Sequence, residues 1–233
     1  MKKIIFFLSL ILTTSSYAES LTLSMTGVIK KTRLTRIAEA ALTNVGKTIG
    51  VRFTIEILPG KRANFLLKSG KIDGDIGRII EFGQKYKKLI RVDEPSIVLP
   101  YYVYTTKENI KVKGWASLKP YSVVYVAGCT FIEANLKQIH NRLYPIGSPQ
   151  QALLFLSAGR ADLHISTPIV LSEYIGSGKL KKLKIRALNP PIINLTLYTY
   201  FQPKHAKIAK KYMIALRQIK KNGVYKRIIN TTM

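Results

Sequence analysis

The sequence has a single cysteine, Cys129, in 233 residues. One cysteine cannot form a disulfide within the chain, so packing must stabilise the fold even in a compartment that permits disulfides. The three histidines, His140, His164 and His205, show no metal-ligand spacing, and no cluster of His and Cys accompanies them. The sequence therefore predicts no metal site.

Motifs of catalysis are also lacking. The sequence contains neither a Gly-rich phosphate loop nor a G-x-S-x-G elbow. Nothing near Cys129 offers a general base, and no acid–base pair can be assigned elsewhere. We therefore expect no catalytic residue and no cofactor.

Acidic residues are scarce: the sequence has 12 Asp and Glu but 38 Lys and Arg, which gives a formal net charge of +26. Such a balance attracts anions, whether nucleic acid, anionic lipid or an acidic small molecule. The basic residues are spread through most predicted helices and loops, without a C2H2 spacing or an RNP-like aromatic motif. We therefore expect no nucleic-acid partner.

The most apolar stretch of the chain lies near the N-terminus, and no other stretch is apolar enough to span a membrane. Lys2 and Lys3 precede apolar residues 4–12, and Ser16-Tyr17-Ala18 forms a small-x-small exit. This is the layout of a secretory signal peptide, and the run is shorter than the roughly 20 residues that span a bilayer. The sequence predicts cleavage after about Ala18 and export of the remaining chain. Without Lys2 and Lys3, 36 basic residues face 12 acidic ones, a net charge of +24.

Beyond this segment, apolar residues alternate between helical and strand spacing, with Gly or Pro at the boundaries. Strands are predicted at residues 21–25, 51–57, 72–76, 89–92, 122–126, 143–146, 162–165 and 183–188. Helices are predicted near 34–45 (with Gly46 as the stop), 61–68, 80–88, from 130, and near 149–158, 169–175, 204–220 and 224–229. This order predicts an α/β fold with mostly parallel sheets covered by helices.

One phrase occurs twice: LLKSGKIDGDIG at 66–77 and FLSAGRADLHIS at 155–166. In both, an apolar helical tail meets a small residue, a Gly, a basic residue, one spacer and an Asp, before a short strand. Two long extended stretches beside prolines, 97–106 and 192–201, separate the two units. We interpret the stretches as crossings between two lobes. Lobe 1 is predicted at 19–99 and 196–233, and lobe 2 at 100–195.

The chain resembles a family of known proteins in the order and spacing of four segments. These are LPGKRANFLLKSGKIDGDIGR (58–78), LPYYVYTT (99–106), WASLKPYSVVYVAGCT (115–130) and AGRAD (158–162). Together with the signal peptide they resemble bacterial periplasmic solute-binding proteins of the two-crossover kind, especially the polar amino-acid receptors of ABC transporters. The resemblance implies a periplasmic, two-lobed venus-flytrap fold that closes on a small molecule and presents it to a membrane permease or a sensor. We expect a monomer.

The candidate ligand-binding residues of lobe 1 follow from the ends of parallel strands, where ligands collect. Arg78 ends the strand of the first phrase, and Gly77 before it allows close backbone approach. A guanidinium there can hold a carboxylate through two hydrogen bonds, although pairing with Asp73 or Asp75 is the alternative. Arg62, near a helix start, is a second candidate, with a solvated helix residue as its alternative.

Lobe 2 offers Ser166 and Thr167 at the end of the second strand, and Thr130 at a helix entry, where it can bind a ligand or cap the helix. Tyr101 and Tyr102 are candidates from the aromatic crossing, but neighbours in a strand cannot both face one cleft.

The pattern departs from that of the amino-acid receptors at two places. Those receptors tend to have an acid after the strand of the second phrase, where this chain has Ser166-Thr167-Pro168, and an Arg where it has Lys85. The missing acid, the net positive charge and the two arginines expected near the cleft favour an anionic ligand. Alternatives that stay open are a ligand-sensing module for a membrane receptor, a dehydratase-like enzyme with Glu133 as an acid, and a binder of polyanions or membrane surfaces.

Overall fold

The computed structural model describes residues 19–28, 32–139, 142–174 and 182–231 of the chain. The predicted signal peptide, residues 1–18, lies outside the described residues. None of the described helices combines the length and the apolar composition needed to cross a membrane.

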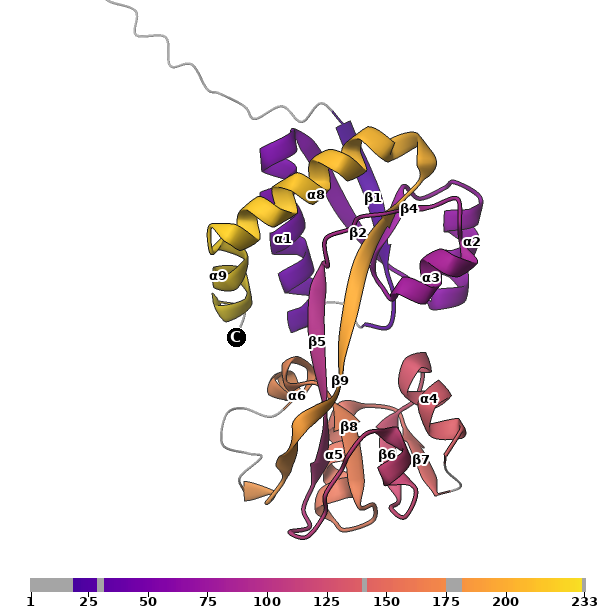
Figure 1. The fold of residues 1–233 in the computed structure, drawn as a ribbon, viewed down its shortest axis with the longest axis vertical. Helices are drawn as coiled ribbons and strands as arrows, with labels where there is room; N and C mark the ends of the chain where they lie inside the picture. Colours follow the sequence, from indigo (N-terminus) through magenta and orange to yellow (C-terminus); the bar gives the residue numbers. More distant parts are fainter. Residues whose placement is uncertain (1–18, 29–31, 140–141, 175–181, 232–233) are drawn as a thin grey trace, which may run out of the picture.

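The described elements gather at the two ends of two long strands, β5 (Ile97–Thr105) and β9 (Arg186–Phe201), as Figure 1 shows. We call the group at one end half A. It consists of β1 (Glu19–Met25), α1 (Arg33–Ile49), β2 (Val51–Ile57), α2 (Gly60–Lys68), β3 (Gly74–Arg78), α3 (Ile80–Lys85), β4 (Ile90–Arg91), η2 (Pro203–His205), α8 (Ala206–Lys221) and α9 (Val224–Thr231).

The group at the other end is half B (Figure 1). It consists of η1 (Trp115–Leu118), β6 (Val123–Val126), α4 (Thr130–Lys137), β7 (Leu143–Ile146), α5 (Pro149–Ser157), β8 (Leu163–Ser166) and α6 (Pro168–Tyr174). In each half three strands run parallel: β2, β1 and β3 in half A, and β7, β6 and β8 in half B. The predicted α/β class is confirmed, and so is the parallel pairing within each set of three; β4, β5 and β9 pair antiparallel, so the sheet as a whole is mixed.

The two sets of parallel strands belong to one hydrogen-bonded path, with the order β2-β1-β3-β9-β5-β8-β6-β7. The path is continuous because β9 pairs with β3 near Tyr200 and with β5 over most of its length, while β5 pairs with β8 near Val103. Buried apolar side chains nevertheless gather separately, in one cluster within half A and two within half B among the described residues. The sequence did not predict the shared path.

Two sequence-based boundaries were wrong. Gly46 lies inside α1, which ends at Ile49 and is capped by Gly50, whose φ of 72° is left-handed. A Cβ at Gly46 would collide with the carbonyl oxygen of Val51, so this glycine allows the helix to approach β2 closely. The segments predicted at 183–188 and 192–201, on either side of Pro190-Pro191, are joined in one 16-residue strand, β9, although residues 189–192 have no partner in β5. A shift of register between Tyr101 and Val103 in the partner strand accommodates the change in pairing.

The repeated phrase forms the same local structure in both halves. Gly70 and Gly159, each with φ of 70°, follow α2 and α5. The next N–H groups, of Lys71 and Arg160, donate to Leu66 and Phe155 at 3.0 and 3.2 Å. This is the hydrogen-bonding pattern of a Schellman C-cap, which turns a helix into the following strand.

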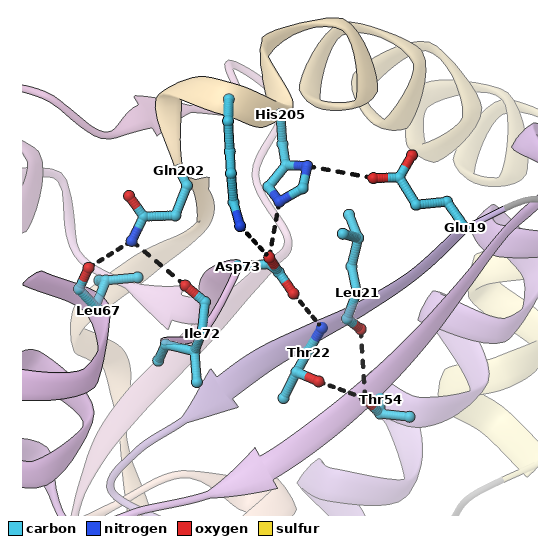
Figure 2. A network of polar contacts seen from close by, with 10 residues as sticks. Glu19, Leu21, Thr22, Thr54, Leu67, Ile72, Asp73, Gln202 and His205 are labelled. Atoms are coloured by element: carbon cyan, nitrogen blue, oxygen red, sulfur yellow. Dashed lines mark hydrogen bonds and ion pairs between the residues drawn. The ribbon is translucent and has the colours of Figure 1, made fainter. Parts of the chain in front are cut away.

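The Asp of each phrase then attaches its strand to the neighbouring parallel strand. Asp73 donates its N–H to the Thr22 carbonyl at 2.9 Å and accepts the Thr22 N–H at 2.9 Å through Oδ2. Asp162 does the same with Ser122, at 3.1 and 2.7 Å. Figure 2 shows that Asp73 also accepts from His205, at 2.8 Å, while Thr22 lies in β1 beside it. The phrase is therefore repeated because it builds the same helix-to-strand connection twice.

Candidate functional site

A cavity of about 470 Å³ lies between half A and half B. From half A it is lined by residues at the carboxyl ends of β1 and β2 and at the start of α1: Gly27, Val28, Thr32, Leu34, Ile57, Leu58 and Pro59. Tyr101 lines it from β5. From half B it is lined by α4, by α6, by the ends of β6 and β8, and by the start of α5 with the residues before it. These residues are Val126, Ala127, Gly128, Cys129, Ile132, Gly147, Pro149, Ile165, Ser166, Thr167, Ile169, Val170 and Glu173. The ends of parallel strands from both halves thus face one space, the usual position of a ligand in open α/β sheets.

Most of these side chains are apolar, and the fixed charge is concentrated at one place. Glu173 is the only Asp, Glu, Lys or Arg among the described residues that line the cavity. Ser166 and Thr167 add hydroxyl groups at the end of β8. Such a lining, apolar with a few polar groups, is typical of sites for small molecules.

Glu173 also connects the halves. Its two carboxylate oxygens both accept the backbone N–H of Arg33, the first residue of α1, at 3.0 Å. Arg36 lies 3.8 Å from the same carboxylate, and the Arg33 side chain donates to Ser172 at 2.7 Å. A carboxylate at a helix N-terminus is stabilised by the free N–H groups and the helix dipole. We call these contacts between α6 and α1 the Glu173 clasp.

Two titratable groups of half B share the cavity wall. Burial raises the pKa of the Tyr101 hydroxyl, and the neighbouring Cys129 adds to that rise. Burial likewise raises the pKa of the Cys129 thiol. Because the thiolate is the reactive form, Cys129 is a weak nucleophile at neutral pH, and no covalent chemistry follows from its position.

Arg78 forms an ion pair inside half A. Its Nη2 lies 2.7 Å from Oδ2 of Asp75 and 3.1 Å from Oδ1 of Asn64, and its guanidinium lies 4.4 Å from the ring centre of Phe82. The Asp75 side chain is fully buried and also accepts from Ser24 at 2.6 Å. Burial raises the pKa of Asp75, while Arg78 and Ser24 act in the opposite direction. Pairing with Asp75, the alternative to a ligand role, is therefore present.

The predicted site residues are divided by the structure. Tyr101, Ser166 and Thr167 line the cavity between the halves, whereas Tyr102 lies on β5 in contact with Tyr104, at 6.4 Å between ring centres. The remaining four lie outside the lining: Arg78 as described, Gly77 beside a separate small cavity, Arg62 exposed on α2, and Thr130 exposed at the start of α4. The described residues contain no group of three His, Cys, Asp or Glu that could hold a metal ion.

Glu173 was missed by the sequence analysis. An acid in half B was expected directly after the strand, where the chain has Ser166-Thr167-Pro168, whereas Glu173 lies five residues beyond Pro168 in α6. The signal in the sequence was available: a lone acid on the short helix that follows the second phrase. Only the packing of α6 against α1 brings that acid to the cavity.

Comparison with known proteins gives a relative and a fold. No protein-family model matches the chain. An "Uncharacterized protein" of Shewanella oneidensis is 32% identical over 197 residues, which cover 82% of this chain and 73% of the relative. An ancestral arginine-binding protein bound to arginine has a TM-score of 0.65 and 17% identity, covering 92% of this chain and 98% of its own.

A probable amino-acid ABC transporter extracellular-binding protein, ytmK from Bacillus subtilis, also has a TM-score of 0.65, with 18% identity over 90% of this chain and 96% of its own. The expected structural resemblance is confirmed. The chain belongs to one family with the Shewanella oneidensis protein and has the fold of bacterial solute-binding proteins of amino-acid ABC transporters.

Proposed function

We propose that this protein is a periplasmic solute-binding protein that holds a small molecule in the cavity between half A and half B and delivers it to an ABC-type importer. The observation that carries the proposal is a 470 Å³ cavity at which the strand ends of both halves meet. That volume is within the range of about 300–1,000 Å³ found for small-molecule sites. The likeness in fold to amino-acid-binding proteins supports the same function.

In this proposal the two halves are the lobes of a venus flytrap that close by bending between them. The lobe boundaries predicted from the sequence, after residue 99 and after residue 195, fall on residues directly paired across β5 and β9, Leu99 and Leu195. Bending two adjacent strands at one level moves the lobes as rigid bodies and leaves their separate cores intact. The Glu173 clasp links the lobes on one side of the cavity.

The ligand we propose is of amino-acid size, with an apolar part facing the lining and an amine near Glu173. The ancestral protein of the same fold was solved with arginine bound, which is compatible with an acid in such a site. The anionic ligand predicted from the sequence rests on the net positive charge, on the lack of an acid directly after β8 and on two arginines, of which Arg78 is paired with Asp75. It stays a prediction, and Glu173 provides the means to test it.

The first experiment is mass spectrometry of small molecules released from natively purified protein, followed by calorimetry with the molecules found and with arginine, glutamine, leucine and succinate. Ala127→Trp fills the cavity from an exposed lining position, and Ala158→Trp, exposed beyond α5, is the matched control. We expect Ala127→Trp to weaken binding at least about tenfold, a loss of about 1.4 kcal/mol, and the control to leave it unchanged. Binding that survives Ala127→Trp would contradict the location.

The sign of the ligand is tested with Glu173→Gln. Removing the negative charge weakens binding of an amine and strengthens binding of an anion, because the same carboxylate attracts one and repels the other. If succinate binds and its affinity rises in Glu173→Gln, the anionic ligand is supported. If arginine or another amine binds and its affinity falls, the amine is supported.

A further inference from the structure

Half A carries a second cavity, of about 410 Å³, whose lining shares no residue with the cavity between the halves. It is formed by the end of α2, by the end of α3 with the segment leading to β4, and by the residues that join β9 to η2. Its lining residues are Leu67, Lys68, Lys85, Tyr86, Lys87, Lys88, Leu89, Gln202 and Pro203. Four of these nine are lysines, and none is acidic.

The four lysines have no counter-charge in the described part of the chain. Lys107, Lys204 and Lys220 form ion pairs with Asp162, Asp73 and Glu94, but no ion pair links Lys68, Lys85, Lys87 or Lys88 to any described acid. All four are exposed. Like charges around one hollow repel one another, and an anion bound among them adds attractions that offset this repulsion.

Helix dipoles explain only part of this charge. Lys68 and Lys85 lie in the last turns of α2 and α3, where a cation is favourable. Lys87 and Lys88 follow α3 in the segment leading to β4, so no helix end accounts for them. Their position around the same hollow is the feature that a solvated basic surface does not explain.

Two other residues of the lining, Tyr86 and Gln202, are held in place by contacts within half A. The Tyr86 ring lies 4.5 Å from Phe82, centre to centre, and carries the Lys68 ammonium 5.5 Å from its own centre. Gln202 donates Nε2 to the carbonyl oxygens of Leu67 and Ile72 (Figure 2). Tyr86 and Gln202 are therefore engaged by contacts within the protein, and the lysines are the groups of the lining that can bind an anion.

We propose that this lysine pocket binds a phosphate-bearing anion, independently of the ligand between the halves. Lysine binds phosphate as a point charge, and several lysines together match a group with more than one negative charge. The phosphate belongs either to a free polyphosphate-type anion or to the headgroup of an anionic lipid. Both offer the same chemistry to the pocket.

The test compares two triple variants with equal loss of charge. Lys85→Gln/Lys87→Gln/Lys88→Gln removes three of the four cations of the pocket, and Lys207→Gln/Lys210→Gln/Lys211→Gln removes three exposed cations from α8. The probes are tripolyphosphate, measured by calorimetry, and phosphatidylglycerol vesicles against phosphatidylcholine vesicles, measured by co-sedimentation. Both are used at about 0.1 M salt, where charges further apart than about 10 Å are largely screened.

We expect the pocket variant to weaken binding at least about tenfold and the α8 variant less than about twofold, since only the first removes cations that share one hollow. Binding of tripolyphosphate alone assigns the pocket to a free phosphate compound, and binding of the anionic vesicles assigns it to a lipid headgroup. Equal losses in both variants, or no binding of either probe, overturn the proposal. Ala127→Trp leaves this binding unchanged, so its outcome is separate from that of the cavity between the halves.

Discussion

Truncating Asp73 to alanine removes the acceptor that attaches β3 to β1. In the folded protein this carboxylate accepts the Thr22 N–H at 2.9 Å, His205 at 2.8 Å and Lys204 at 3.1 Å, with its side chain 20% exposed. Burial alone would raise the pKa of Asp73, but hydrogen bonds from Thr22, His205 and Lys204 outweigh it and the pKa is lowered. The charged form is therefore the one that stabilises the fold.

The size of the loss follows from the groups left without a partner. A buried donor that loses its acceptor costs about 1–3 kcal/mol, and hydrogen bonds to a charged group contribute about 1.5–3 kcal/mol. Thr22 N–H and His205 both lose their acceptor, each at the lower end of this range because the site is only partly buried, while Lys204 returns to water; we therefore expect a loss of about 2–3 kcal/mol. For a chain of this length that corresponds to a fall of about 4–12 °C in Tm.

The assay is thermal unfolding followed by circular dichroism at pH 7. Asp162→Ala in the second phrase is expected to cost a similar amount, because Asp162 accepts the Ser122 N–H and hydroxyl with its side chain 16% exposed. Asp93→Ala is the control, an acid with 66% exposure whose ion pair lies at the surface. A change within about 1 °C for Asp73→Ala, the size expected of a surface pair, would refute the structural role given to the phrase.

Three further predictions concern pH, packing and the clasp. The pKa of Asp73 in the folded protein lies below its ordinary 3.8. The extra stability of the native protein relative to Asp73→Asn is therefore complete above pH ~5 and disappears as the pH falls through the folded pKa. Urea titrations that show the same extra stability at pH ~3 would contradict this. Gly74→Ala places a Cβ 2.8 Å from a Leu23 methyl and still closer to the Tyr200 carbonyl oxygen of β9. We expect it to lower the free energy of unfolding in urea by about 1–3 kcal/mol. The control Gly60→Ala, whose Cβ meets open space, is expected to change it by less than about 0.5 kcal/mol. Glu173→Gln weakens the acceptor of the first α1 amide, so hydrogen exchange of that amide is expected to accelerate about tenfold, and unchanged protection would argue against the clasp.

Elements whose pattern is local were predictable. In α1 the apolar spacing and the helical face agree, and in β2 strict alternation identifies the strand. The repeated phrase was visible as a repeat because a Schellman turn requires Gly at one position and the strand attachment requires Asp three residues later. Both requirements act within a few residues, so the sequence carries them directly.

Features that depend on distant partners were not predictable. Gly46 has the sequence appearance of a helix stop, and only the approach of β2 explains why it lies inside α1. The prolines of β9 predict a break, and only the pairing with β5 on both sides of them, at Leu188 and Ile193, shows a single strand that bulges there. The residues of the site differ in the same way. Ser166 and Thr167 were predictable because they follow the end of a predicted strand, whereas Glu173 lies at the cavity through its contacts with Arg33, 140 residues away in the sequence.

The net charge led the sequence analysis to an anion in the cleft, but net charge and site charge are separate quantities. The charge of +24 without Lys2 and Lys3 creates a positive field around the whole molecule, while the charged group in the described lining is the acid Glu173. A field of this kind acts on the rate at which a ligand arrives, and salt screens it. An anion is therefore expected to associate more slowly as salt is raised, a cation faster, and a zwitterion at a nearly constant rate. Stopped-flow association between about 0.02 and 0.5 M salt distinguishes these cases, since the Debye length falls several-fold over that range. A rate that falls steeply with salt would refute the amine proposed here and restore the anion predicted from composition.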